Sequence, residues 1–293
     1  MNTTLPADPA AFYATLVERN AGLLTSDEQT ALRRRRFVIA GCGSTGGACV
    51  MPLVRSGAEH LVLLDPGKYE LNNLNRQDAT LAELGQNKAL VLASHVAAVN
   101  PFAEVEVHSE GVVPATSGAL LRPADIVVDA IDVTTPSGVE AKLALHSAAC
   151  ALRLQVVTAY DIATTQYVEL FDYRRERRPL RGLVPPHPAP DQMLRALIPM
   201  RVLPTRIFGV LEQRVSEPDR PLPQLMMTSS LLGALVVPYL LRVALDRPVR
   251  RRLWLDVEQP LRPRHEQVRE RIGRLLGMLR LWLLLRNERP KHA

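Results

Sequence analysis

The sequence is poor in cysteine, lysine and aromatic residues, and each shortage removes a class of protein. The three cysteines, Cys42, Cys49 and Cys150, are widely spaced with no Cys-x-x-Cys pair, which argues against a disulfide framework and against a four-thiolate zinc site. Only four of the 36 basic residues are lysine, and aromatic residues make up 4% of the chain. The interleaved basic and aromatic residues of a single-strand nucleic-acid platform are therefore missing. We expect no structural zinc, and the composition argues against a nucleic-acid partner.

No apolar run reaches the roughly 20 residues that a bilayer-spanning helix needs. The two longest runs, Leu231–Leu241 and Leu275–Leu285, are broken by Pro238 and Arg280, and we interpret both as core helices. The N-terminus has no basic region followed by an apolar segment, so no secretory signal is predicted. Together with the unpaired cysteines, these absences predict a cytoplasmic protein with no membrane partner.

What is present is the composition of an ordinary folded chain. The 293 residues are 47% hydrophobic and 23% charged, close to the globular averages of roughly 45–50% and 25%. Short apolar runs alternate with helical stretches from residue 37 to residue 159. This alternation predicts an α/β fold, a doubly wound, Rossmann-like and mainly parallel sheet with helices on both faces. C-terminal antiparallel strands and helices are expected to complete it.

The expected elements follow from the apolar runs and their periods. We predict strands at 37–40, 61–64, 105–108, 126–128, 156–159, 166–171 and 253–256, and helices at 45–55, 88–99, 137–152, 224–245 and 265–285. The strand at 166–171 follows a short turn and is expected to be antiparallel to its predecessor.

Composition divides the chain into four stretches. We expect a helical N-terminal arm at residues 1–35, a nucleotide-binding domain at 36–171, a crossover or lid segment at 172–223, and C-terminal helices and a strand at 224–293. Prolines and arginines dominate the third stretch, so we interpret it as an inserted loop.

A glycine-rich loop follows the first predicted strand. Gly41, Gly43 and Gly46 stand in the order G-x-G-x-x-G between an apolar run and a helical stretch. There Gly41 permits a tight turn, Gly43 lets the backbone approach a phosphate, and Gly46 lets the helix pack close to the strand. Asp65 ends the next apolar run, where a carboxylate accepts hydrogen bonds from ribose hydroxyls. NAD, FAD and ATP all fit these features.

Two cations downstream favour ATP among these ligands. Arg76 lies in Asn73-x-x-Arg76-Gln and Lys88 in Gly-Gln-x-Lys88, shortly after the ribose carboxylate. The helix N-terminus already neutralises the pyrophosphate of a dinucleotide, so a dehydrogenase has no need of them. A triphosphate carries about two more charges, and a reaction that expels pyrophosphate needs fixed cations on the leaving group.

The stretch from Arg36 to about Phe171 resembles the ThiF/MoeB/HesA family, whose adenylating fold is shared with ubiquitin-activating enzymes. The matching pieces are GCGSTGG, LLDPGKYELNNLNRQ, GQNKA, VNP at 99–101 and VVDAIDV at 127–133. The tail matches only loosely, through the helix at 227–245 and the run LWLDVE.

This resemblance implies roles for individual residues. Asp65 corresponds to the ribose-binding aspartate of the family, and Asn73, Arg76 and Lys88 to its contacts with the ATP phosphates. Asp132 falls on the aspartate associated with Mg²⁺ and the reaction centre, a role in which a carboxylate at a strand end is chemically suitable. Asp129, inside the apolar run, is the weaker candidate for that metal.

The resemblance also implies an assembly. Arg19, in the run VERNAGLL, resembles the arginine of an N-terminal arm that reaches the phosphates of a neighbouring subunit. Members of the family usually dimerise through the nucleotide domain, so a homodimer is expected.

The departures from the family matter as well. Its zinc-binding members carry two Cys-x-x-Cys pairs after the sheet, and other members use a crossover cysteine to accept the acyl group or sulfur. This chain has no cysteine after Tyr173, and Cys42, Cys49 and Cys150 are interpreted as small buried hydrophobic residues. No covalent enzyme intermediate is therefore expected.

We therefore expect an ATP- and Mg²⁺-dependent adenylyltransferase. A carboxylate would displace pyrophosphate and remain as an acyl-adenylate. The resemblance implies a substrate that is the C-terminus of a ubiquitin-like protein or a peptide, or else a small molecule. Two alternatives stay open, an NAD- or FAD-dependent oxidoreductase and a non-catalytic nucleotide-binding scaffold.

Overall fold

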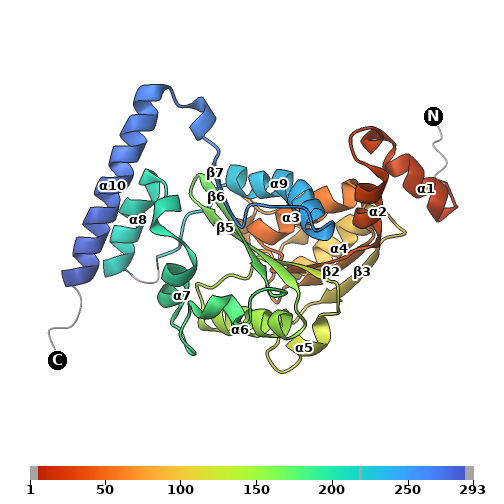
Figure 1. The fold of residues 1–293 in the computed structure, drawn as a ribbon, viewed down its shortest axis with the longest axis horizontal. Helices are drawn as coiled ribbons and strands as arrows, with labels where there is room; N and C mark the ends of the chain where they lie inside the picture. The colour runs from red at the N-terminus through yellow and green to blue at the C-terminus, as the bar shows by residue number, and fades with distance from the viewer. Residues whose placement is uncertain (1–5, 218–219, 288–293) are drawn as a thin grey trace.

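A seven-stranded sheet forms the centre of the computed structural model, which describes residues 6–217 and 220–287 (Figure 1). The strands are β1 (Arg36–Ala40), β2 (His60–Leu64), β3 (Glu104–His108), β4 (Ile126–Asp129), β5 (Gln155–Ile162), β6 (Thr165–Asp172) and β7 (Arg252–Asp256). Their order in the sheet is β3-β2-β1-β4-β5-β6-β7. The first five are parallel, whereas β6 and β7 are antiparallel. The predicted doubly wound α/β sheet with antiparallel C-terminal strands is confirmed.

Helices cover both faces of this sheet. They are α1 (Pro9–Leu16), α2 (Ser26–Arg34), α3 (Ser44–Arg55), α4 (Lys88–Val99), α5 (Ser117–Leu120), α6 (Pro136–Ala151), α7 (Pro190–Leu197), α8 (Thr205–Ser216), α9 (Met226–Ala244) and α10 (Arg264–Asn287). One core cluster joins the sheet to α3, α4 and α9, and a second joins the opposite face to α5, α6 and α7 (Figure 1). Because both faces are covered, the central parallel strands carry apolar residues at successive positions, as in the run LVLL of β2.

The proline- and arginine-rich stretch is more ordered than its composition suggested. It contains α7 and α8, where the sequence pattern had predicted an inserted loop. Pro190 occupies the first turn of α7 and Pro204 precedes α8, positions where proline is tolerated because the amide it lacks would be unpaired anyway. The prolines here therefore start helices instead of excluding them.

The two apolar runs interpreted as core helices have different outcomes. In the described part of the chain, α9 alone is long and apolar enough to cross a bilayer, but half of its most apolar window is buried in the protein. It packs so closely on α3 that a Cβ added at Gly233 would lie 2.7 Å from the Ala48 carbonyl oxygen. The prediction for α10 is wrong. Only Leu281 of its large apolar side chains is fully buried, because α10 contacts the rest of the fold mainly through α8.

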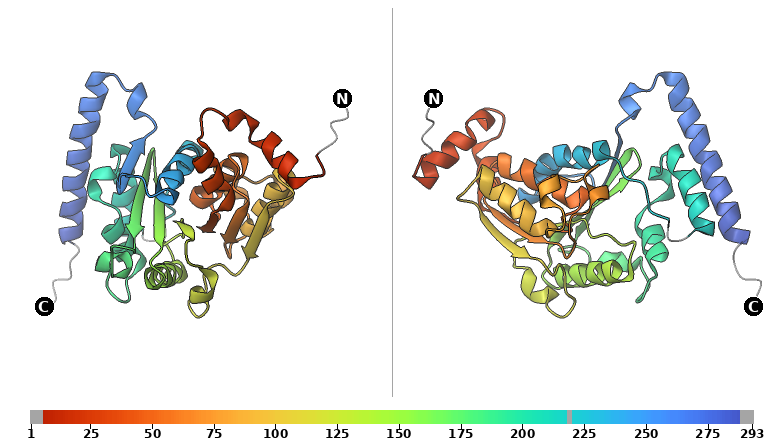
Figure 2. Two further views of the ribbon diagram at one scale, coloured as in Figure 1. Left: turned by 45° about the vertical axis from the view of Figure 1, so that its right-hand side comes forward. Right: turned by 180° about the vertical axis from the view of Figure 1, so that it is seen from behind.

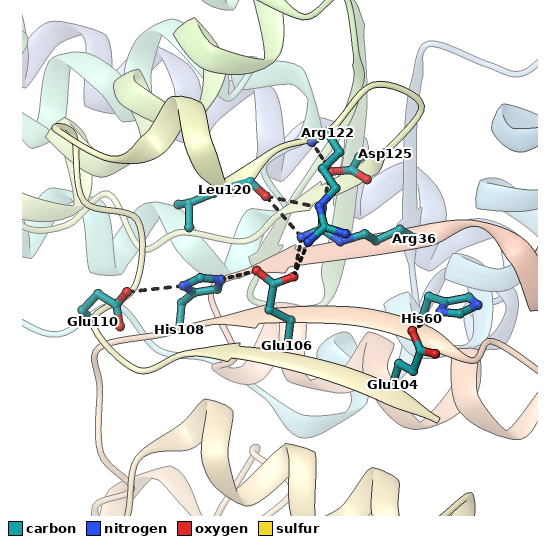
Figure 3. Close-up of polar contacts among 9 residues, drawn as sticks. All are labelled: Arg36, His60, Glu104, Glu106, His108, Glu110, Leu120, Arg122 and Asp125. Atoms are coloured by element: carbon teal, nitrogen blue, oxygen red, sulfur yellow. Dashed lines mark hydrogen bonds and ion pairs between the residues drawn. The ribbon is translucent and has the colours of Figure 1, made fainter. Parts of the chain in front are cut away.

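Charged residues line the edge strand β3 (Figure 3). Arg36 at the start of β1 pairs with Glu106 at 2.8 Å and with the buried Asp125 at 2.6 Å. His108 lies between Glu106 and Glu110 and contacts both carboxylates. Partial burial raises the pKa of Glu106, but hydrogen bonds from His108 and Arg36 outweigh it and hold this pKa below its usual range. Charges on an edge strand discourage pairing with strands of other chains.

Candidate functional site

The glycine loop connects β1 to α3 at the carboxyl end of the sheet. Gly41 has a φ of +90°, and a Cβ there would lie 2.4 Å from the Ala130 carbonyl oxygen. A Cβ on Gly46 would lie 1.8 Å from the Gly41 carbonyl oxygen. Packing therefore requires both glycines. Gly43 is different, because the nearest atom to an added Cβ is Gln77 Nε2 at 3.9 Å. No steric reason inside the protein explains Gly43, which is the position expected to approach a phosphate.

The first turn of α3 lacks a side-chain cap. Its N-cap residue is Gly43, which has no side chain to accept hydrogen bonds from the first amides. Ser44 and Thr45, the first two residues of the helix, are buried. An uncapped helix start carries unpaired N–H groups and a partial positive charge, which suits an anion.

Asp65 joins the glycine loop to the loop after β2. Its Oδ2 accepts a hydrogen bond from the Cys42 amide at 2.6 Å, and its Oδ1 accepts one from the Gly67 amide at 2.6 Å. Burial raises the pKa of this carboxyl, the two amides lower it, and the charges of Lys88 and Asp132 act in opposite directions. A carboxylate offers about four acceptor positions, so two remain for ribose hydroxyls.

Lys88 lies at the start of α4, close to Asp65. Asn87 caps this helix by accepting hydrogen bonds from the amides of residues 89 and 90, and it donates to the Asp65 carbonyl oxygen at 2.8 Å. The ammonium of Lys88 is 5.9 Å from the ring centre of Tyr69 and has no carboxylate within ion-pair distance among the described residues. The site therefore contains a half-buried cation that is close to the Asp65 carboxylate, whose pKa it lowers, without forming a direct ion pair among the described residues.

Asn73 and Arg76 belong to the loop that follows. Asn73 is buried, and its Oδ1 accepts a hydrogen bond from the Glu70 amide, so its side chain stabilises the turn in which it lies. Arg76 donates from Nε to Gln224 Oε1 at 2.6 Å and from Nη1 to the Asn72 carbonyl oxygen at 2.8 Å. Arg76 thus connects the loop to the segment before α9, with partners that are all neutral.

Asp132 lies in the loop after β4, the strand that is next to β1 in the sheet. It is exposed, and its Oδ1 accepts a hydrogen bond from the Thr134 amide at 2.9 Å. Its charge is close enough to raise the pKa of Asp65. The structure therefore brings Gly43, Asp65, Lys88 and Asp132 to one end of the sheet, at the strand-order reversal where such folds bind ligands.

Arg19 is not part of this cluster within its own chain. The arm that carries it packs on the C-terminal end of α3, where Tyr13 donates to the Gly57 carbonyl oxygen and Asn20 to that of Ser56. The glycine loop is at the other end of the same helix, roughly 18 Å away for 12 residues at 1.5 Å each. Arg19 is exposed.

A groove of about 530 Å³ runs along α3, between its glycine-loop end and the end on which the arm packs. Its lining residues come from α3, the loop at 74–79 and α9: Ala48, Pro52, Ser56, Leu74, Arg76, Gln77, Asp78, Ala79, Met226, Ser229, Ser230, Gly233, Ala234 and Val237. The groove therefore extends from Arg76 to the end of α3 on which the arm packs.

Asp129 is excluded as a metal ligand by its surroundings. It is fully buried, its Oδ2 lies 2.5 Å from Lys142 Nζ and 2.9 Å from His146 Nε2, and Thr158 donates to it. Burial raises its pKa, but the Lys142 charge and the His146 hydrogen bond outweigh this and lower it. Its Oδ1 accepts from the amide of residue 131, so this ion pair braces the loop that leads to Asp132.

Asp161 is a site neighbour that sequence reasoning missed. It ends β5, accepts a hydrogen bond from Ser229 Oγ at 2.7 Å, and lies against the hydroxyls of Ser44 and Thr45 in the first turn of α3. Burial raises the pKa of its carboxyl, and these hydroxyls and Arg76 counteract the rise. An aspartate in an antiparallel hairpin gives no sequence signal, because its position against α3 depends on α9, about 70 residues later.

The cysteines carry no reactive signature. Cys42 and Cys49 are fully buried, and burial raises the pKa of both thiols. Cys150 is only half-buried, so its expected full burial is wrong, yet burial still raises its pKa. A raised pKa disfavours the thiolate that nucleophilic attack requires. Within residues 6–217 and 220–287, no group of three or more His, Cys, Asp and Glu side chains could hold a metal ion.

Relatives of known sequence match part of the chain. An uncharacterized protein of Mycobacterium tuberculosis is 32% identical over 174 residues, which is 59% of this chain and 24% of that protein. A sulfur carrier protein adenylyltransferase of Thermus thermophilus is 33% identical over 105 residues, which is 36% of this chain and 39% of that protein. The chain thus spans about a quarter to two fifths of these curated relatives.

The fold has a close counterpart among solved structures. The ATP complex of Escherichia coli tRNA N6-threonylcarbamoyladenosine dehydratase superposes with a TM-score of 0.57 at 20% sequence identity, over 80% of this chain and 96% of that one. The model of the ThiF family matches residues 17–250, which include the second half of the arm, the glycine loop, the first six strands and α9. The chain belongs to the ThiF family.

Proposed function

We propose that this protein is an ATP-dependent adenylyltransferase that activates a carboxylate as an acyl-adenylate. The observation that carries the proposal is the pairing of an open Gly43 beside an uncapped helix start with the cation of Lys88, which forms no direct ion pair among the described residues. Family membership supports it, because a relative is named as an adenylyltransferase and a dehydratase of similar fold has been crystallised with ATP.

The residues fit ATP better than a dinucleotide. The start of α3 and Gly43 suit a phosphate, and Asp65 has acceptor positions left for a ribose. Lys88 and Arg76 are then left to bind additional phosphate charge, which a triphosphate carries and a dinucleotide lacks. The NAD- or FAD-dependent alternative therefore has no use for these two side chains.

The chemistry follows from these positions. An oxygen of the substrate carboxylate attacks the α-phosphorus, the new C–O–P linkage forms, and the bond from that phosphorus to the bridging oxygen breaks. Pyrophosphate leaves with the electron pair of that bond. Arg76 and Lys88 stabilise the charge that develops on the leaving group, and the rest of catalysis is positioning. The deeply buried cysteines of the site take no part.

Mg²⁺ is a proposed cofactor of this reaction. The exposed carboxylate of Asp132 is the residue that would hold it, sharing the ion with phosphate oxygens as a site with one protein carboxylate does. When bound, Mg²⁺ supplies charge neutralisation at the phosphates.

The proposed substrate is the C-terminus of a ubiquitin-like protein or a peptide, or a small carboxylate. Relatives named for sulfur carrier and ubiquitin-like proteins support the protein substrates. The acceptor of the activated acyl group must come from another molecule, because the cysteines here are inert. The segment at 172–223 would contact the substrate as a lid.

We further propose a homodimer in which Arg19 acts in trans. Arg19 lies at the wrong end of α3 to serve its own glycine loop, so a role at the phosphates requires a second subunit. The groove between Arg76 and the arm is the proposed place of contact.

Pyrophosphate exchange tests the activity. With a supply of candidate carboxylates and Mg²⁺, labelled pyrophosphate should enter ATP, because adenylation is reversible until the acyl group is transferred. Lys88→Ala and Arg76→Ala should each reduce the exchange rate about 10²-fold or more. Calorimetry without a carboxylate gives a second readout, since ATP should release heat and NADH should not. Tight binding of NADH with no response to ATP would overturn the proposal.

A further inference from the structure

Helix α10 stands at one end of the molecule with its outer face uncovered (Figures 1 and 2). Its inner face packs on α8, where a Cβ added at Gly277 would lie 2.4 Å from the Phe208 ring. Glu270 Oε1 accepts a hydrogen bond from the Thr205 amide at 2.7 Å, which caps the start of α8. These contacts fix which side of α10 faces the protein and which side faces away.

The outward side carries a continuous row of large apolar residues, here called the α10 stripe. Its members are Val268, Ile272, Leu275, Leu276, Leu279, Trp282 and Leu283, each 44–63% exposed. Five of them, at 268, 272, 275, 279 and 282, repeat at intervals of four and three residues. This is the spacing of the a and d positions of a heptad repeat, with which one helix packs along another. A soluble protein rarely leaves such a stripe uncovered.

Arginines border the α10 stripe on both sides. At roughly 100° per residue, Arg264 and Arg271 flank one side, and Arg269 and Arg280 flank the other. The two acidic residues of α10 lie away from the stripe, toward α8. Of the four bordering arginines, only Arg280 has an ion-pair partner in the described part of the chain, Glu212 of α8 at 3.2 Å. An occupant of the stripe therefore meets a positive border.

Charge distinguishes the possible occupants. A second copy of α10 would place arginine against arginine in either a parallel or an antiparallel pair, since both borders are basic. A lipid surface needs a broad apolar face and basic flanks but no heptad spacing. An acidic amphipathic helix satisfies both the spacing and the charge.

We propose that the α10 stripe is the docking surface for an acidic amphipathic helix of a partner protein. The apolar row packs into the a and d row of the partner, and the bordering arginines pair with its flanking glutamates or aspartates. This inference does not depend on the adenylation chemistry, because α10 lies outside the nucleotide site.

A designed peptide tests the chemistry of the surface. A fluorescein-labelled peptide of three heptads, with Leu at a and d and Glu at e and g, is titrated with the full chain and followed by anisotropy. A matched peptide carries Lys in place of Glu. The Glu peptide should bind at least about tenfold more tightly, and added salt should weaken it. Arg269→Glu with Arg271→Glu should reverse this preference.

Single substitutions separate the surface from general stickiness. Leu279→Glu should weaken binding of the Glu peptide roughly tenfold or more, because it buries a charge in the apolar row. The control Leu261→Glu introduces the same charge at a leucine that is 80% exposed and lies outside the stripe, so binding should be unchanged. Both sites are exposed, so circular dichroism and Tm should confirm that the variants fold.

Three outcomes would overturn the proposal. Equal binding of the Glu and Lys peptides, or binding of neither, would remove the charge-matched helix as the occupant. Self-association in sedimentation that Leu279→Glu abolishes would assign the stripe to a second copy. Co-sedimentation with vesicles of phosphatidylglycerol and phosphatidylcholine, lost in Leu279→Glu and without peptide binding, would assign it to lipid.

Discussion

Gly43 is the N-cap of α3 and Gly46 lies in the first turn of that helix, three residues later, and the two glycines serve different needs. An added Cβ at Gly46 would clash with the Gly41 carbonyl oxygen, whereas at Gly43 it would meet nothing closer than 3.9 Å. At a glycine beside an uncapped helix start that the fold does not require, a ligand that approaches the backbone gives a physical reason for the missing side chain. The motif G-x-G-x-x-G names both residues, but only the surroundings tell which one belongs to packing and which to the ligand.

The two glycines give the first prediction. Gly43→Ala should change the free energy of unfolding by less than about 1 kcal/mol, since the methyl group has room, yet it should weaken ATP binding about tenfold or more. Gly46→Ala should instead destabilise the fold by several kcal/mol or prevent folding, because backbone atoms must move. Urea denaturation and calorimetric titration with ATP measure the two effects. An unaltered ATP affinity in Gly43→Ala would contradict the phosphate role.

The buried Asp129 pair makes stability depend on pH. A carboxylate can only accept, so His146 carries its proton on Nε2 toward Asp129, and its Nδ1 accepts from the Tyr173 hydroxyl at 2.6 Å. Burial holds the pKa of His146 below its usual value, which keeps the ring neutral in the folded protein. The unfolded chain therefore protonates this histidine near pH 6.5, whereas the folded chain keeps it neutral at that pH.

The second prediction follows from that difference. As pH falls below about 6.5, the free energy of unfolding should decrease by up to about 1.4 kcal/mol per pH unit from this residue. His146→Gln keeps an N–H donor for Asp129 but has no titrating group, so its stability should be flatter between pH 6.5 and 5. Urea midpoints of both proteins across this range measure the effect. Parallel pH curves would show that His146 does not contribute. The stability that comes from the lowered pKa of Asp129 is lost only at lower pH.

At the scale of elements, the contact between α3 and α9 joins the two halves of the site. Gly233 on α9 lies against the Ala48 carbonyl oxygen of α3, and Ser229 on α9 holds Asp161 beside the start of α3. The position of the glycine loop therefore depends on a helix that lies about 190 residues later in the chain.

The third prediction compares two helical glycines. Gly233→Ala should destabilise the protein by about 1–3 kcal/mol, because its Cβ would lie 2.7 Å from the Ala48 oxygen. Gly209→Ala on α8 has no atom within 4 Å and should stabilise the protein by about 0.5–1 kcal/mol, because alanine favours a helix. Thermal unfolding of both variants measures the difference. A stabilised Gly233→Ala would indicate that helix propensity, not the α3–α9 contact, governs these sites.

At the scale of the whole molecule, one chain holds an incomplete set of the proposed phosphate contacts. Lys88 and Arg76 are at the glycine-loop end of α3, and Arg19 is at the opposite end. Two chains related by a two-fold axis along the groove could exchange arms, since symmetric dimers repeat each contact twice.

The fourth prediction uses mixed dimers. Arg19→Ala and Lys88→Ala should each be inactive in pyrophosphate exchange when they are alone. After subunit exchange in an equal mixture, activity should return to about a quarter of wild type, because half of the dimers are mixed and each of these has one intact site. Sedimentation checks that mixed dimers form. Mixed dimers with no recovered activity would show that Arg19 does not act across the subunit boundary.

The sequence by itself determined the local parts of this protein. The alternation of apolar runs with helical stretches predicted the doubly wound sheet, because the period of burial is written into consecutive residues. The antiparallel turn into β6 and the glycine loop were predictable for the same reason, since a few adjacent residues fix each turn. The motifs at 41–46, 65, 73–76, 88 and 132 placed the candidate site at the carboxyl end of the strands.

Only the tertiary structure decided what depends on residues far apart in the chain. Asp129 changed from a possible metal ligand to a closed ion pair because α6 brings Lys142 and His146 against it. Asp161 belongs to the site because Ser229 on α9 donates a hydrogen bond to it and the start of α3 lies against it. The leucines of α10 have the composition of a core, but the fold provides α8 to cover only one side of that helix. An apolar side chain is more stable when it is buried, but the arrangement of the whole chain decides whether another element covers it.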